Sequence, residues 1–103
     1  MRVVQLTLYS RAGCCLCKGL EDKLRTITWK EIHPQLNFYV KNIDSCEVTD
    51  NERARYSMEV PVLTLHSSEG NLVVELPRVS PRLQQEGLVT WLYKQIQENI
   101  ERV

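Results

Sequence analysis

Three of the four cysteines stand within four consecutive positions early in the chain, in the stretch SRAGCCLCKGL. Cys14 and Cys17 form a Cys-x-x-Cys motif directly after a strand-like segment and at the start of a helical one, a context that favours thiol–disulfide chemistry. Residues three apart on a helix lie on one face about 5–6 Å apart, which suits an unstrained disulfide. A helix N-terminus carries a partial positive charge that stabilises a thiolate, and Arg11 adds a cation three residues upstream. We therefore predict that Cys14, the outer thiol, is the nucleophile and that Cys17 resolves the mixed disulfide.

Two other interpretations of the cysteines stay open. Cys14, Cys15 and Cys17 could bind zinc or a metal cluster, although structural zinc sites usually draw on a second pair of ligands. The further candidate ligands are scattered single residues: His33, Cys46 and His66. Alternatively, the protein is a redox-inert interaction domain whose cysteines are small apolar residues. We expect no metal site, a packing or tuning role for Cys15, and a loop or core position for Cys46.

Periodicity and breakers along the chain predict the elements that position these thiols. Apolar alternation, helical leucine spacing and turn residues give the order β-α-β-α-β-β-α. The predicted strands are 3–9, 36–44, 60–66 and 71–77, and the predicted helices are 13–29, 48–56 and the segment from Ser80 onward. The spacer SSEGN suits an antiparallel hairpin between the last two strands, whereas the first half suits a right-handed parallel crossover. The order predicts one α/β domain over residues 1–103 with a thioredoxin-like fold, in which helices cover both faces of a four-stranded mixed sheet.

Composition disfavours several classes of function. The 13 basic residues balance the 13 acidic residues, so no broad positive field attracts nucleic acid or an anionic membrane. No apolar run approaches the roughly 18 residues that span a bilayer, and the alternating start MRVVQLTLYS is typical of a strand rather than of a signal peptide. We therefore expect a protein of the cytoplasm or an organelle, and we expect it to be a monomer. In such a reducing compartment, clustered cysteines are more often catalytic or metal-binding than part of structural disulfides.

A second signal is the Val60-Pro61 pair in the stretch EVPVLTL. Proline is tolerated at the start of a strand, because its missing N–H costs least there. We predict that the Val60-Pro61 bond is cis and that Pro61 lies beside Cys14. The Val60 backbone would then face the thiol and could pair with a peptide or with glutathione as an additional strand.

The string LTLYSRAGCCLC, the helix after it, the segment EVPVLTL and the closing helix resemble the glutaredoxin family of the thioredoxin superfamily, over essentially the whole chain. They are most similar to its small glutaredoxin-like branch. The resemblance implies a thiol–disulfide oxidoreductase that acts on glutathione or protein mixed disulfides without a metal or organic cofactor, with glutathione as a co-substrate. It also implies that Cys14 is the nucleophile, that Cys17 resolves, and that Arg11 contacts a glutathione carboxylate. Val60 would offer its backbone beside a cis proline, Pro61.

The chain departs from the pattern of this family at two places. Glutaredoxins usually have Pro-Tyr between the cysteines, where this chain has Cys15-Leu16, and these positions influence the redox potential. The family has a Gly-Gly-acidic stretch before the final helix, where this chain has PRVSPRL. Ser80 can cap that helix and Pro81 suits its first turn, but Ser80 brings no charge and Pro81 lacks an N–H that could bind a glutathione carboxylate. We therefore expect weak glutathione binding and regard a protein substrate as an equal candidate.

Overall fold

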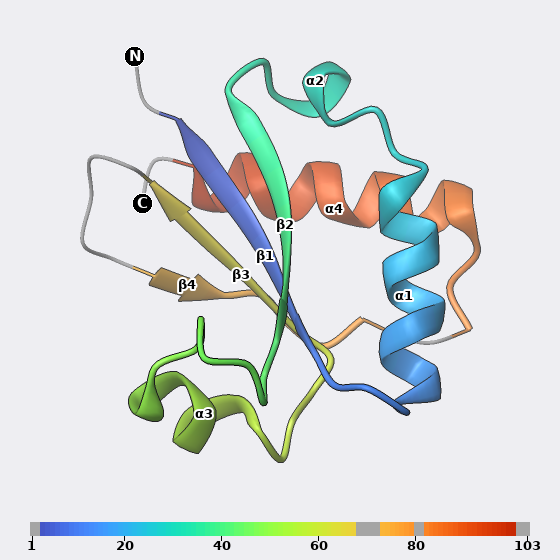
Figure 1. Ribbon diagram of the computed structural model, residues 1–103. Coiled ribbons are helices and arrows are strands. Elements are labelled where there is room, and N and C mark those ends of the chain that lie inside the picture. Colours follow the sequence, from blue (N-terminus) through green and yellow to red (C-terminus); the bar gives the residue numbers. More distant parts are fainter. Residues whose placement is uncertain (1–2, 68–72, 80–81, 101–103) are drawn as a thin grey trace.

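The computed structural model describes residues 3–67, 73–79 and 82–100 of the chain. Its elements follow in the order β1 (Val4–Ser10), α1 (Cys15–Arg25), α2 (Trp29–Ile32), β2 (Leu36–Asn42), α3 (Asp50–Tyr56), β3 (Val62–Ser67), β4 (Val73–Glu75) and α4 (Gln85–Asn99). The strands form one mixed sheet with the order β2-β1-β3-β4 (Figure 1). β1 is parallel to β2 and antiparallel to β3, and β4 is antiparallel to β3. The predicted arrangement, a parallel half joined to a hairpin half, is therefore confirmed.

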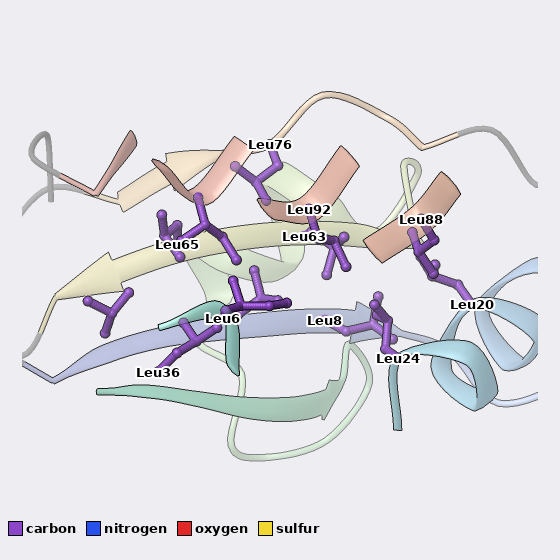
Figure 2. Packing of buried hydrophobic residues seen from close by; sticks show 13 residues of the cluster. Leu6, Leu8, Leu20, Leu24, Leu36, Leu63, Leu65, Leu76, Leu88 and Leu92 are labelled. Atoms are coloured by element: carbon purple, nitrogen blue, oxygen red, sulfur yellow. The ribbon is translucent and has the colours of Figure 1, made fainter. Parts of the chain in front are cut away.

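The leucine side chains that alternate along β1 lie on the face of the sheet that carries the main core. Leu6 and Leu8 are fully buried on one face, where they stand opposite Leu65 and Leu63 of the neighbouring β3. Leucines at helical spacing on α1 and α4 bring two apolar stripes onto this face. The helix residues that Figure 2 shows packed over the strand leucines are Leu20 and Leu24 of α1 and Leu88 and Leu92 of α4. This core fixes the first turns of α1, and with them the cysteine motif, against the sheet.

α3 packs against the opposite face of the sheet, beside the end of β1. The ring of Tyr9 lies against the ring of Tyr56 in α3, with centroids 4.7 Å apart, and buried aliphatic side chains complete this second cluster. A capping box starts the helix: the hydroxyl of Thr49 accepts the N–H of Glu52 at 3.1 Å, and the Glu52 carboxylate accepts the N–H of Thr49 at 3.0 Å. Helices therefore cover both faces of the sheet, as predicted.

The structure corrects the end of the first predicted helix. α1 ends at Arg25 instead of continuing to residue 29, because the β-branched run Thr26-Ile27-Thr28 is a poor helix former. The Thr26 hydroxyl donates a hydrogen bond to the Lys23 carbonyl at 2.8 Å, which satisfies one of the free carbonyls at the helix end. α2, a single turn that periodicity did not predict, follows and leads into β2.

The last helix begins later than predicted. α4 starts at Gln85, and the predicted capping roles of Ser80 and Pro81 lie outside the described residues. Contacts with α1 fix this start: Gln85 Nε2 donates to the Lys23 carbonyl at 3.1 Å, and Lys23 Nζ donates to the Leu83 carbonyl at 2.9 Å. Within the parts of the chain that the structure describes, neither α4 nor any other helix is long and apolar enough to cross a membrane.

Candidate functional site

The loop between β1 and α1 presents Cys14 at the start of the helix. Gly13 has a φ of +83°, a left-handed conformation that glycine adopts without steric penalty. The N–H of Cys14 donates to the Arg11 carbonyl at 3.2 Å, which closes the turn. Cys14 is the N-cap residue of α1, and its Sγ accepts a hydrogen bond from the backbone N–H of Cys17 at 3.1 Å. Sulfur here takes the place that a serine or aspartate oxygen usually has, and the same N–H group can stabilise a thiolate.

The two motif cysteines differ in accessibility. Cys14 is half-buried at the rim of the site, whereas Cys17 is only 1% exposed and belongs to the core side of α1. Their Cα atoms are 5.2 Å apart, and their sulfur atoms lie at disulfide distance. The predicted outer and inner positions are confirmed, while their chemical roles stay predictions.

The other two cysteines are free and exposed. Cys15 is the first residue of α1 and lines the groove that also contains Cys14 and Cys17, and Cys46 is in the loop after β2. Among the described residues, no group of three or more histidine, cysteine, aspartate or glutamate side chains is arranged to hold a metal ion. In the described part of the chain, His33, Cys46 and His66 are thus not grouped with the motif cysteines as a ligand set, and the expectation of no metal site stays a prediction.

Val60 and Pro61 precede β3, which begins two residues later than predicted. The Val60-Pro61 peptide bond is cis, as predicted. Pro61 lies across from the first two turns of α1, with which it shares a cavity of about 110 Å³. We call this cavity the apolar cleft; its lining residues are Cys15, Leu16, Gly19, Leu20, Lys23, Pro61, Arg78, Val79, Leu83 and Leu88. The cleft brings Pro61 together with Cys15 and Leu16, but Cys14 does not line it. The predicted placement of Pro61 beside Cys14 therefore stays a prediction.

Arg11 does not stand free beside the thiols. Its Nε and Nη2 donate to the two carboxylate oxygens of Asp44 at 3.0 and 3.2 Å, and its Nη1 donates to the Ser57 carbonyl at 3.1 Å. Sequence reasoning missed Asp44. Because Ser10 pairs with Asn42 in the parallel register, the residues that directly follow β1 and β2 meet at one edge of the sheet. The register comes from the fold, and no pattern in the sequence signals this contact.

A buried tyrosine supports the end of β1 from the opposite face. The Tyr9 hydroxyl donates a hydrogen bond to the Glu52 carboxylate, and burial, followed by this contact, raises the pKa of Tyr9 far above its usual range. Burial alone would raise the pKa of Glu52, but the hydrogen bonds from Tyr9 and Thr49 and the nearby Lys41 cation lower it. The pair thus stays a neutral phenol with a carboxylate, and it holds α3 against the strand that leads into the cysteine loop.

A four-stranded mixed sheet of this order, with a Cys-x-x-Cys pair at the start of α1, defines a thioredoxin-like fold of the thiol-redox type. Solved structures share this fold. A malarial protein is 14% identical with a TM-score of 0.57, over 91% of this chain and 98% of its own. The germline-specific thioredoxin Deadhead of Drosophila melanogaster is 11% identical with a TM-score of 0.58, over 88% of this chain and 79% of its own. At these identities the likeness establishes the fold alone.

The family follows from the sequence. The profile of the glutaredoxin-like domain (DUF836) matches residues 5–93, and the chain therefore belongs to this glutaredoxin-like family. The match runs from β1 into α4 and includes Arg11, Cys14, Cys17 and Pro61. None of the curated proteins matches the chain in sequence. The predicted membership in the glutaredoxin-like branch of the thioredoxin superfamily is confirmed.

Proposed function

We propose that this protein is a thiol–disulfide oxidoreductase of glutaredoxin-like type, with Cys14 as the nucleophile and Cys17 as the resolving thiol. One observation carries the proposal. The half-buried Cys14 sulfur lies at the N-terminus of α1, accepts the N–H of Cys17, and is within disulfide distance of the buried Cys17 sulfur. A substrate disulfide therefore meets Cys14 first, and Cys17 is within reach of the mixed disulfide that forms.

The proposed exchange has two balanced steps. The Cys14 thiolate attacks one sulfur of the substrate disulfide; a bond forms between Cys14 and that sulfur, and the second substrate sulfur leaves as a thiolate that takes up a proton. Cys17 then loses its proton and attacks Cys14 Sγ, and the first substrate sulfur leaves as a thiolate in turn. Two electrons have passed to the substrate, and the protein holds a Cys14–Cys17 disulfide.

The cycle closes when the protein disulfide is reduced again. Two molecules of glutathione, or one dithiol reductant, supply the two electrons and return Cys14 and Cys17 to thiols. Glutathione is then a co-substrate that leaves as its disulfide. The proposed cycle needs neither a metal ion nor an organic cofactor bound to the protein.

The surroundings of Cys14 favour a protein disulfide as the substrate. Leu16, two residues after the nucleophile, is 52% exposed and lines the apolar cleft together with Pro61 and Val79. An apolar cavity somewhat larger than this one, about 150 Å³, is known to hold a benzene-sized group, so the apolar cleft suits one aliphatic side chain next to a substrate cysteine. The backbone of Val60, the residue before Pro61 of the cleft, is our proposed contact for the main chain of the substrate.

Thiol counting in glutathione buffers tests the proposal. The reduced chain has four thiols, and oxidation with glutathione disulfide should remove two of them, Cys14 and Cys17, in one two-electron step. The same protein should reduce bis(2-hydroxyethyl) disulfide with glutathione as the electron donor. Cys14→Ser should abolish both properties, whereas Cys46→Ser, which removes an exposed thiol in the loop after β2, should leave both unchanged. A chain that keeps four thiols under oxidising conditions and reduces no disulfide is a redox-inert domain, and the proposal then fails.

A further inference from the structure

The carboxylate of Asp44 is bound to Arg11 near the proposed active site, and it has no role in the proposed exchange reaction. Its two oxygens accept hydrogen bonds from Nε and Nη2 of Arg11 at 3.0 and 3.2 Å. This pairing of two guanidinium nitrogens with two carboxylate oxygens is the bidentate geometry in which an arginine binds a carboxylate. With the bond from Nη1 to the Ser57 carbonyl, three of the five N–H groups of Arg11 are engaged. Asp44 thus occupies the face of Arg11 that is best suited to bind an incoming carboxylate.

Backbone contacts hold this pair in a fixed relation to Cys14. The side chain of Asn42 accepts the N–H of Asp44 at 2.9 Å, and the Ser10 carbonyl accepts the N–H of Ile43 at 2.7 Å. On the other side, the Arg11 carbonyl accepts the N–H of Cys14 at 3.2 Å. The guanidinium and the nucleophile therefore belong to one turn, and Arg11 and Cys14 line the same open groove beside α1.

We infer that Asp44 is a specificity-determining residue: it acts as an internal carboxylate on Arg11 and disfavours small disulfides that carry carboxylates, relative to uncharged disulfides and protein disulfides. The inference rests on the proposed function, because it concerns which substrates reach Cys14. Glutathione is such a carboxylate-bearing thiol. To use the fork of Arg11, its carboxylate must first displace that of Asp44.

Exposure sets the size of the effect. The side chains of Arg11 and Asp44 are 37% and 54% exposed, so water screens the pair and an incoming carboxylate can reach it. Exposed ion pairs are individually weak, and removing the competing carboxylate should therefore change affinity by about two- to fivefold. Asp44 biases the choice of substrate and does not close the site.

Binding and turnover of the full-length protein test the inference separately. In an NMR titration with S-methylglutathione, which has no exchangeable sulfur, Asp44→Asn and Asp44→Ala should bind about two- to fivefold more tightly than the wild type, and Asp44→Glu should restore the wild-type affinity. In turnover, Asp44→Asn should lower the KM for glutathione disulfide by the same factor without changing kcat. Turnover of bis(2-hydroxyethyl) disulfide with dithiothreitol as the electron donor, in which neither the substrate nor the reductant has a carboxylate, should not change.

A matched control separates this effect from net charge. Asp50 pairs with Arg53 at 3.0 Å on α3, and Asp50→Asn removes the same charge from another exposed aspartate–arginine pair. This variant should bind S-methylglutathione as the wild type does. The inference is overturned if Asp44→Asn and Asp44→Ala bind no more tightly than Asp50→Asn, or if they show no binding at all. Failure of the proposed function looks different: no variant would reduce either disulfide, while the titration would still decide the role of Asp44.

Discussion

The backbone N–H of Cys17 donates a hydrogen bond to the sulfur of Cys14 at 3.1 Å. This bond makes the proposed nucleophile the N-cap of α1, so one interaction both starts the helix and supplies a donor to the sulfur. A sulfur atom in this position carries more electron density as a thiolate than as a thiol, and the hydrogen bond therefore favours the thiolate. Helix formation and the donor that would stabilise a Cys14 thiolate thus depend on the same hydrogen bond.

The turn before the helix should depend on glycine. Gly13 has a φ of +83°, and Gly13→Ala should lower the free energy of unfolding by about 1–2 kcal/mol, because a Cβ atom is strained in this conformation. Gly19 is its control: it lies on an exposed turn of α1, where an added Cβ would meet no atom within 4 Å apart from its chain neighbours and the backbone of its own helix. Gly19→Ala should raise the free energy of unfolding by about 0.5–1 kcal/mol. Urea denaturation measures both, and equal effects of the two substitutions would contradict the described turn.

The core side of the sheet should tolerate truncation far less than the rim of the site. Leu65 is fully buried between the sheet and the helices, and Leu65→Ala should cost about 2–5 kcal/mol of stability. Leu16 is 52% exposed, and Leu16→Ala should cost less than about 0.5 kcal/mol. Thermal unfolding of both variants makes the comparison. If Leu16→Ala destabilises as strongly as Leu65→Ala, then Leu16 is not at the exposed rim of the apolar cleft.

The Tyr9–Glu52 hydrogen bond should give stability a dependence on pH. The lowered pKa of Glu52 means that its contribution is present at neutral pH and is lost as the pH falls below the usual value of 4.5. The raised pKa of Tyr9 means that its contribution is present below the usual value of 10.0 and is lost as the pH rises above it. Tyr9→Phe should lower stability by about 1 kcal/mol at pH 7 and flatten both losses.

Tyr39→Phe is the control for this prediction. Tyr39 is 45% exposed on β2, and removing its hydroxyl should leave stability and both pH dependences unchanged. Denaturant unfolding between about pH 3 and pH 11, the range over which carboxylates and phenols titrate, provides the measurement. A Tyr9→Phe variant with the same acid loss as the Tyr39→Phe variant would show that the hydrogen bond to Glu52 contributes nothing.

The order of the elements could be predicted because each depends on neighbouring residues. Leu6 and Leu8 alternate along β1, and Leu88 and Leu92 repeat at helical spacing along α4, so local pattern alone places them in the core. The position of the cysteine motif at the first turn of α1 follows from the same patterns. The end of α1 was missed, because the propensity of Thr26 competes there with the apolar stripe that continues through Ile27.

Two contacts near the cysteine motif could not be predicted, because each joins residues that are far apart in the sequence. Arg11 meets Asp44 only because the parallel register of β1 and β2 brings their ends together. Tyr9 meets Glu52 only because α3 folds back over the end of β1. Neither pairing leaves a periodic signal in the sequence, since each joins a strand end to a loop or helix that follows another strand. The position of the cysteine motif was thus accessible from the sequence, whereas the contacts of Arg11 and Tyr9 required the fold.

Mass spectrometry of the Cys17→Ser protein after reaction with glutathione disulfide tests the central claim most directly. Without Cys17 the mixed disulfide cannot be resolved, so the account predicts one glutathione adduct per chain, located on Cys14 by peptide mapping. The Cys14→Ser protein, treated in the same way, should carry no adduct at the motif. An adduct on Cys15 instead of Cys14, or a Cys17→Ser protein that stays unmodified, would contradict the assignment of Cys14 as the nucleophile.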